Sequence, residues 1–162
     1  MAAHATATGF GLSLLDRLAD AAPDSRTEAP PSSWELARQY KESLCRDLAA
    51  LLNTRRAEQD FDPVWVQATN SLLTFGVTDF TSYNLKNGIE QERVRRSIER
   101  SIRLFEPRLG HVTVTLEEPD VLRPVLRFQV AAVLRQSAGD PVLFDVTLYR
   151  DTRRISVSGA SS

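Results

Sequence analysis

The sequence is poor in the residues that build disulfides and metal centres. It has a single cysteine, Cys45, so no disulfide can form within the chain, and a reducing compartment is the simplest interpretation. The two histidines, His4 and His111, are far apart in sequence, and no second ligand stands at metal-binding spacing from Cys45. These scarcities predict a protein with no metal and no other cofactor.

Glycine and long apolar runs are also scarce. The 7 glycines include no glycine-rich loop placed between a strand and a helix, so a phosphate-binding loop is not predicted. No apolar run approaches the length of a membrane span, and no Lys or Arg precedes the short apolar segment near the N-terminus. We therefore expect a cytoplasmic location without direct membrane insertion.

No excess of either charge is present, because the formal net charge is −1. This balance argues against a protein-wide field that attracts nucleic acid, although a local patch is compatible with it. Residues 84–105 contain six Lys or Arg and three Asp or Glu. This basic segment is either a solvated helix with internal ion pairs or a surface for an acidic protein partner, which we favour over nucleic acid.

The chain is long enough for one self-supporting domain, preceded by a segment of different composition. Residues 1–31 read as a flexible N-terminal segment with a short apolar motif of Leu14, Leu15 and Leu18, followed by an Ala-, Pro- and Ser-rich linker. The motif either packs back on the domain or docks on a partner. Residues 32–162 are predicted to form a single domain.

Three helical segments are predicted in the first part of this domain. Ser32 and Glu35 fit a capping box that starts an amphipathic helix ending near Asn53. Residues 64–75 form a short element that could be a helix with Pro63 at its first position. A further helix begins at Asn84 or Asn87 and ends before Pro107. Its predicted apolar stripe consists of Ile89, Val94, Ile98, Ile102 and Phe105.

Beyond that helix the apolar period changes to two. Alternating runs occupy residues 112–116, 126–132 and 142–148, with a short last run at 155–157, and turn residues separate them. Such a pattern predicts an antiparallel meander with one buried face. The expected fold class is α+β, with the N-terminal amphipathic helices packed on an antiparallel sheet of about four strands.

A pair of carboxylates offers the remaining route to catalysis. Glycoside hydrolysis needs two acids at a suitable separation, one of them kept protonated. Glu106 stands at a helix C-terminus, where the macrodipole disfavours an anion, and Asp79 in the preceding loop could be the second acid. A saccharide cleft also needs aromatic platforms, and aromatic residues make up only 7% of the chain. We therefore keep a muramidase-like hydrolase as the alternative to a non-enzyme.

Several stretches, in order and spacing, resemble one family. They are Ser13–Leu18, Arg46–Leu48 leading to Leu51–Arg56, Ser71–Gly76, and Ile98–Glu99 leading to Ile102–Leu109 with its Phe-Glu-Pro-Arg-Leu run. The chain is similar to the TssE family of type VI secretion baseplate subunits, within the phage baseplate-wedge proteins historically labelled lysozyme-like. The Asn-Tyr-Gly-Leu-Pro-Asp stretch of that family reads Thr-Phe-Gly-Val-Thr-Asp here, over residues 74–79.

The resemblance implies a non-catalytic structural subunit that links the wedge core to the base of a contractile sheath. Its partners would be other baseplate wedge proteins and sheath proteins, and its location the cytoplasmic face of the inner membrane. The predicted partner-binding residues are the turn Glu106, Pro107 and Arg108 and the N-terminal leucine motif. Glu106 and Arg108 either reach a partner or satisfy each other as a local clamp, and the sequence leaves both open.

Overall fold

The computed structural model describes residues 32–56, 62, 64–80, 82–84, 86–117, 125–135 and 139–159. The leucine motif and the boundary predicted at residue 31 lie outside these residues and stay predictions. The chain divides into two compact units, Met1–Leu44 and Cys45–Ser162. The boundary falls within helix α2 (Ser33–Asn53), so the described part of the first unit is the beginning of this helix.

Helix α2 starts at the predicted capping box. The Ser32 backbone N–H donates to Glu35 Oε2 at 2.8 Å, and the Glu35 N–H returns a bond to Ser32 Oγ at 3.4 Å. The hydrogen bonds from Ser32 lower the pKa of Glu35, which keeps its carboxylate ionised at the positive end of the helix. The helix ends at Asn53, as predicted.

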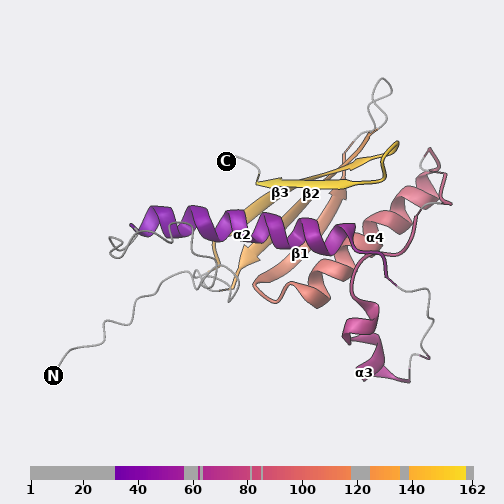
Figure 1. The fold of residues 1–162 in the computed structure, drawn as a ribbon, viewed down its shortest axis with the longest axis horizontal. Helices are drawn as coiled ribbons and strands as arrows, with labels where there is room; N and C mark the ends of the chain where they lie inside the picture. Colours follow the sequence, from indigo (N-terminus) through magenta and orange to yellow (C-terminus); the bar gives the residue numbers. More distant parts are fainter. Residues whose placement is uncertain are drawn as a thin grey trace, which may run out of the picture. The chain divides into compact units, whose positions relative to one another are not determined.

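The second unit is built on a four-stranded antiparallel sheet in the order β1-β2-β3-β4 (Figure 1). The strands are β1 (Leu109–Leu116), β2 (Val125–Leu134), β3 (Pro141–Tyr149) and β4 (Ile155–Gly159). Burial alternates along β2 and β3. The buried side chains are Leu126, Phe128, Val130 and Ala132 on β2, and Val142, Phe144, Val146 and Leu148 on β3. The predicted α+β class and meander are confirmed.

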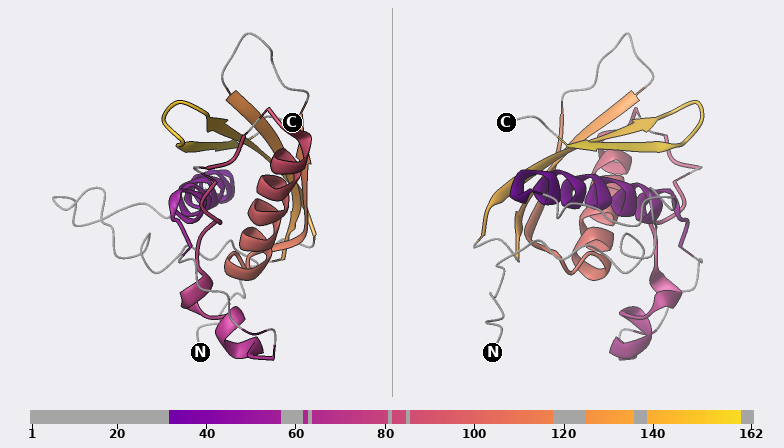
Figure 2. Two further views of the ribbon diagram at one scale, coloured as in Figure 1. Left: turned by 90° about the vertical axis from the view of Figure 1, so that its right-hand side faces the viewer. Right: turned by 60° about the vertical axis from the view of Figure 1, so that its left-hand side comes forward.

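Helix α4 (Gly88–Phe105) packs beside β1 (Figure 2). Asn87, one of the two predicted caps, accepts the Ile89 N–H on its side chain at 3.0 Å. Val94, Ile98 and Ile102 are buried as the stripe predicts. Ile89 is 65% exposed, because it belongs to the first helical turn, which extends beyond the core.

The element predicted over residues 64–75 is two short helices, α3 (Val66–Thr69) and 3-10 helix η1 (Leu72–Thr74). Local hydroxyl bonds break the continuity. Thr69 Oγ1 donates to the Val66 carbonyl, and Ser71 Oγ donates to Ala68 O and accepts the Leu73 N–H. The α3–η1 segment projects away from the sheet (Figure 2).

The two sheet edges differ in how their backbone groups are bonded. On β1, the Val112 carbonyl accepts from Arg103 at 2.7 Å and the Val114 carbonyl from Arg95 at 2.9 Å. Side chains of α4 thus close this edge. On β4, the Asn53 amide exchanges two bonds with the Ile155 backbone, at 2.8 and 3.0 Å. Beyond Ile155, the outer side of β4 has no partner among the described residues of the second unit.

Candidate functional site

The predicted partner-binding turn carries two charges that bond to each other. Glu106 follows α4 and its side chain is 6% exposed. Both of its oxygens accept from the Arg108 guanidinium, Oε1 from Nε at 2.7 Å and Oε2 from Nη2 at 2.6 Å. Pro107 between them is exposed. The two charges therefore form a bidentate pair within a stiff turn.

A third residue extends this pair. Asp47 of α2, within the second unit, accepts from Arg108 Nη2 at 2.7 Å, so one guanidinium joins two carboxylates separated widely in sequence. The bond to Glu106 and then that to Asp47 raise the pKa of Arg108 against the opposing effect of burial. We call these three residues the paired cluster. It connects α2 to the junction of α4 and β1.

The same geometry bears on the hydrolase alternative. A general acid must carry a proton, whereas Glu106 presents both oxygens as acceptors to one guanidinium. Asp79, the proposed second acid, pairs with Arg55 at 3.6 Å. The structure thus places each carboxylate in its own ion pair.

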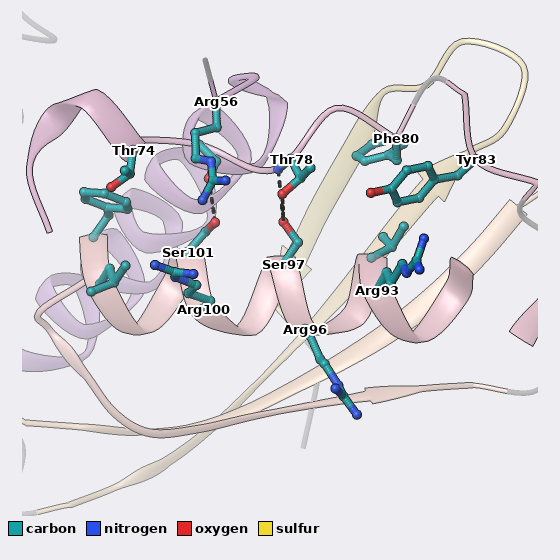
Figure 3. A pocket seen from close by; sticks show the side chains of 14 residues that line it. Arg56, Thr74, Thr78, Phe80, Tyr83, Arg93, Arg96, Ser97, Arg100 and Ser101 are labelled. Carbon is teal, nitrogen blue, oxygen red and sulfur yellow. Dashed lines mark hydrogen bonds between the residues drawn. The ribbon is translucent and has the colours of Figure 1, made fainter. Parts of the chain in front are cut away.

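A pocket of about 300 Å³ lies between α4 and the segment 74–83 (Figure 3). Sequence reasoning did not identify it. Its apolar wall comprises Phe80, Val94, Leu104 and Phe105, with Tyr83 at one end. Among the described residues, no acid lines it and four arginines do: Arg56, Arg93, Arg96 and Arg100.

The pocket wall is held by a left-handed glycine and two serines. Gly76 has a φ of +102°, and a Cβ there would lie 2.3 Å from the Thr54 carbonyl oxygen. Ser101 Oγ donates to the Gly76 carbonyl, and Ser97 Oγ accepts the Thr78 N–H at 3.0 Å (Figure 3). Serines four residues apart beside the apolar stripe were the sequence signal for a polar contact on this helix face.

Backbone pairing also fixes the position of Arg56. The Arg56 N–H donates to the Val77 carbonyl at 2.8 Å, and the Val77 N–H donates to Thr54 O at 2.9 Å. This short parallel bridge brings the Arg56 side chain to the same end of the pocket as Arg100, near Ser101 (Figure 3).

The four arginines are not equally compensated. Arg93 pairs with Glu90 at 3.1 Å, and Arg96 with Glu92 at 2.7 Å. Hydrogen bonds from Arg95 and Arg96 lower the pKa of Glu92 to about 2, so Glu92 is an anion at neutral pH. For Arg56 and Arg100, the described part of the chain provides neither a carboxylate partner nor a side-chain hydrogen bond.

An apolar ridge is the other exposed feature of this unit. It comprises Val64, Trp65, Val66, Leu72 and Leu73, which are 57–82% exposed. Apolar side chains gathered in this way mark contact surfaces more often than isolated exposed ones. The ridge belongs to the projecting α3–η1 segment, so a partner could reach it from several sides.

Fold and surface together define an α+β unit with an ion-paired turn, an exposed apolar ridge and a basic pocket. The chain matches the model of the family "Baseplate wedge protein gp25" over residues 38–138, more than half of its length. It belongs to this family, whose type VI homologue is TssE. A comparison with curated proteins gave no significant match. The helices that the structure describes include none long and apolar enough to span a membrane.

Proposed function

We propose that the protein is a non-catalytic structural subunit of a type VI secretion baseplate wedge, linking the wedge core to the base of the contractile sheath. The family match over residues 38–138 carries this proposal, because it assigns the chain to the baseplate wedge proteins. Its partners are other wedge proteins and sheath proteins, and its place is the cytoplasmic face of the inner membrane.

The absence of catalysis is supported by the bonding of Glu106. An acid whose two oxygens accept from Arg108 at 2.6 and 2.7 Å is poorly placed to donate a proton to a glycosidic oxygen. We expect no clearing of a peptidoglycan suspension by the purified protein. Clearing that Glu106→Gln abolishes would favour the hydrolase instead.

Contact with wedge proteins is proposed to use the turn and the ridge. In the turn, Glu106 positions Arg108, and Pro107 between them is exposed. The apolar ridge adds side chains that gain free energy when a partner covers them, about 25 cal/mol per Å² of apolar surface. The leucine motif Leu14, Leu15 and Leu18 is proposed as a further docking segment.

Contact with the sheath is proposed to use strand addition at the edge of β4. The alternative edge, β1, already bonds to side chains of α4. In an antiparallel ladder, successive residues direct their N–H groups to opposite sides. The bonds between Ile155 and Asn53 indicate that the backbone N–H and C=O groups of Ile155, Val157 and Gly159 point away from β3. Those of Ser156 point toward β3.

A matched pair of proline variants tests this edge. Val157→Pro removes an outward donor and leaves the β3 ladder bonded, whereas Ser156→Pro removes a donor within the sheet. We expect Ser156→Pro to lower the melting temperature far more, and Val157→Pro to stay folded yet recover fewer sheath proteins. Normal sheath recovery by a folded Val157→Pro variant would exclude β4 as the receiving edge.

Wedge contacts are tested by affinity purification from the native host, with identification of the proteins that co-purify. The ridge variant Trp65→Ser with Leu72→Ser should melt like the parent and lose wedge proteins. Ile89→Ser is the matched control, because Ile89 is an equally exposed apolar side chain on another element. If parent and ridge variant recover the same partners, the ridge is not a contact surface.

A further inference from the structure

The pocket beside α4 contains two arginines for which the residues that the structure describes supply no counter-ion. Arg56 and Arg100 converge on one end of it, and neither has a carboxylate partner among the described residues. Like charges brought together without a counter-ion repel each other, at a cost that a bound anion would remove. Two guanidinium groups placed together in this way, with the Arg56 backbone bonded to Val77, favour a site for a negatively charged group.

We propose that this pocket binds a segment of a partner protein in which an Asp or Glu carboxylate lies next to a large apolar side chain. The carboxylate bonds to Arg56 and Arg100. The apolar side chain contacts Leu104 and Phe105, which follow Arg100 by about one turn of α4. The proposal rests on the assembly function only in taking the occupant to be a protein.

The chemistry of the walls defines this ligand. A guanidinium presents paired N–H donors that match a carboxylate, and such charge-assisted bonds are stronger than neutral ones. The hydroxyls of Ser97 and Ser101 already bond to the segment 76–78, so recognition of charge falls to the arginines. The apolar walls require the ligand to carry more than a charge.

The shape of the surface favours an extended segment over a small free anion. A second hollow, of about 330 Å³, shares Arg96, Arg100 and Leu104 with the pocket and is also lined by Asn70, Glu99 and Arg103. The two hollows adjoin at Arg96, Arg100 and Leu104, so together they offer more surface than a small anion can cover. A peptide chain can fill both, whereas a lone anion would leave the apolar wall exposed.

A protein occupant is also favoured over nucleic acid. The whole chain has a net charge of −1, so it lacks the broad basic field that supplies most non-specific nucleic-acid affinity. The positive charge is instead local and faces apolar side chains. A pocket with these properties is suited to select a segment that carries an acidic residue beside a Leu or Phe.

Selection from a phage-displayed library of random short peptides, on the purified full chain, tests the proposal. We expect enrichment of peptides with Asp or Glu beside Leu, Phe or Trp. A fluorescent copy of an enriched peptide should bind Arg56→Gln with Arg100→Gln about tenfold more weakly or worse. Changing its acid to the matching amide should have a similar effect.

Arg127→Gln is the matched control, because Arg127 is an exposed arginine on β2, away from the pocket. Its affinity for the peptide should equal that of the parent. The proposal is overturned by absence of enrichment, by equal binding to the double variant, or by self-association that the double variant abolishes. It is also overturned if a single-stranded oligonucleotide, and no peptide, depends on both arginines. None of these outcomes affects the wedge role, which co-purification tests separately.

Discussion

Two arginine sites of the second unit differ in their state of pairing. In the paired cluster, Arg108 is 17% exposed and bonds to both Glu106 and Asp47. In the pocket, Arg56 and Arg100 stand beside apolar walls, and no acid lines these walls in the part of the chain that the structure describes. In the first site the charges bond to one another, so its proposed role is to hold the exposed Pro107 in a stiff turn. The second has unused bonding capacity, which is what a binding site needs.

The comparison shows that a prominent sequence motif and an available surface are separate properties. The Phe-Glu-Pro-Arg run predicts a functional contact because a glutamate at a helix C-terminus opposes the macrodipole. The geometry resolves that conflict internally, since Arg108 compensates Glu106. The pocket arginines belong to no conspicuous motif, and folding alone brings them together.

The largest expected effect is on the pocket wall. Gly76→Ala forces a side chain into a left-handed conformation, with its Cβ 2.3 Å from the Thr54 carbonyl oxygen. We expect a loss of about 3 kcal/mol or more in the free energy of unfolding, measured with denaturant. Gly88→Ala is the control, because a Cβ at Gly88 meets nothing within 4 Å. It should leave stability unchanged or raise it by up to about 1 kcal/mol. Equal stability of the two variants would disprove the role of Gly76.

The next effect falls on the paired cluster. Glu106→Gln leaves a half-buried guanidinium with one acid fewer, and we expect a loss of about 2–3 kcal/mol. Arg108→Lys keeps the charge but not the two-pronged geometry, and should cost about 1–2 kcal/mol. Urea unfolding curves measure both values.

The exposed pair of Arg38 with Glu42 provides a control for the cluster. Its atoms lie 3.0 Å apart, as in a strong ion pair, yet both side chains are about 60% exposed. Glu42→Gln should therefore change stability by less than about 0.5 kcal/mol. If Glu106→Gln unfolds like Glu42→Gln but recovers fewer wedge proteins, the turn is an interface and not a clamp.

A smaller effect is expected on acidification. The pKa of Glu92 is lowered from 4.5 to about 2 in the folded protein by its hydrogen bonds to Arg95 and Arg96. A depressed folded-state pKa contributes stability that is complete above about 4.5 and is lost as the pH falls toward 2. Glu92→Gln should flatten the acid side of the stability profile over that interval. A profile identical to that of the parent would show that these bonds contribute nothing in solution.

The smallest expected effect is on the stability of the pocket variants. Arg100→Gln removes a charge that has no partner acid in the described structure, so we expect the free energy of unfolding to change by less than about 0.5 kcal/mol. At low salt the change should be a slight gain, because repulsion from Arg56 is relieved. A loss above 1 kcal/mol would mean that Arg100 has a structural role.

Periodicity and capping are local properties, so they were enough to predict the fold class and most of the secondary structure. The period-two runs predicted all four strands, and Ser32, Glu35 and Asn87 marked two helix starts. One failure was local in origin, and the other was tertiary. Bonds of Thr69 and Ser71 split one predicted element in two, and the exposed position of Ile89 depends on where the core ends.

Which charges are paired and which surfaces stay exposed depends on contacts between different elements of the fold. Asp47 and Arg108 meet because α2 passes the start of β1, and Arg56 faces Arg100 because Gly76 admits the Thr54 backbone. The arginines of α4 close the β1 edge, whereas Asn53 covers only the first residue of β4. Each of these contacts joins residues of different elements. Their strength depends on distance and burial, which no local pattern encodes.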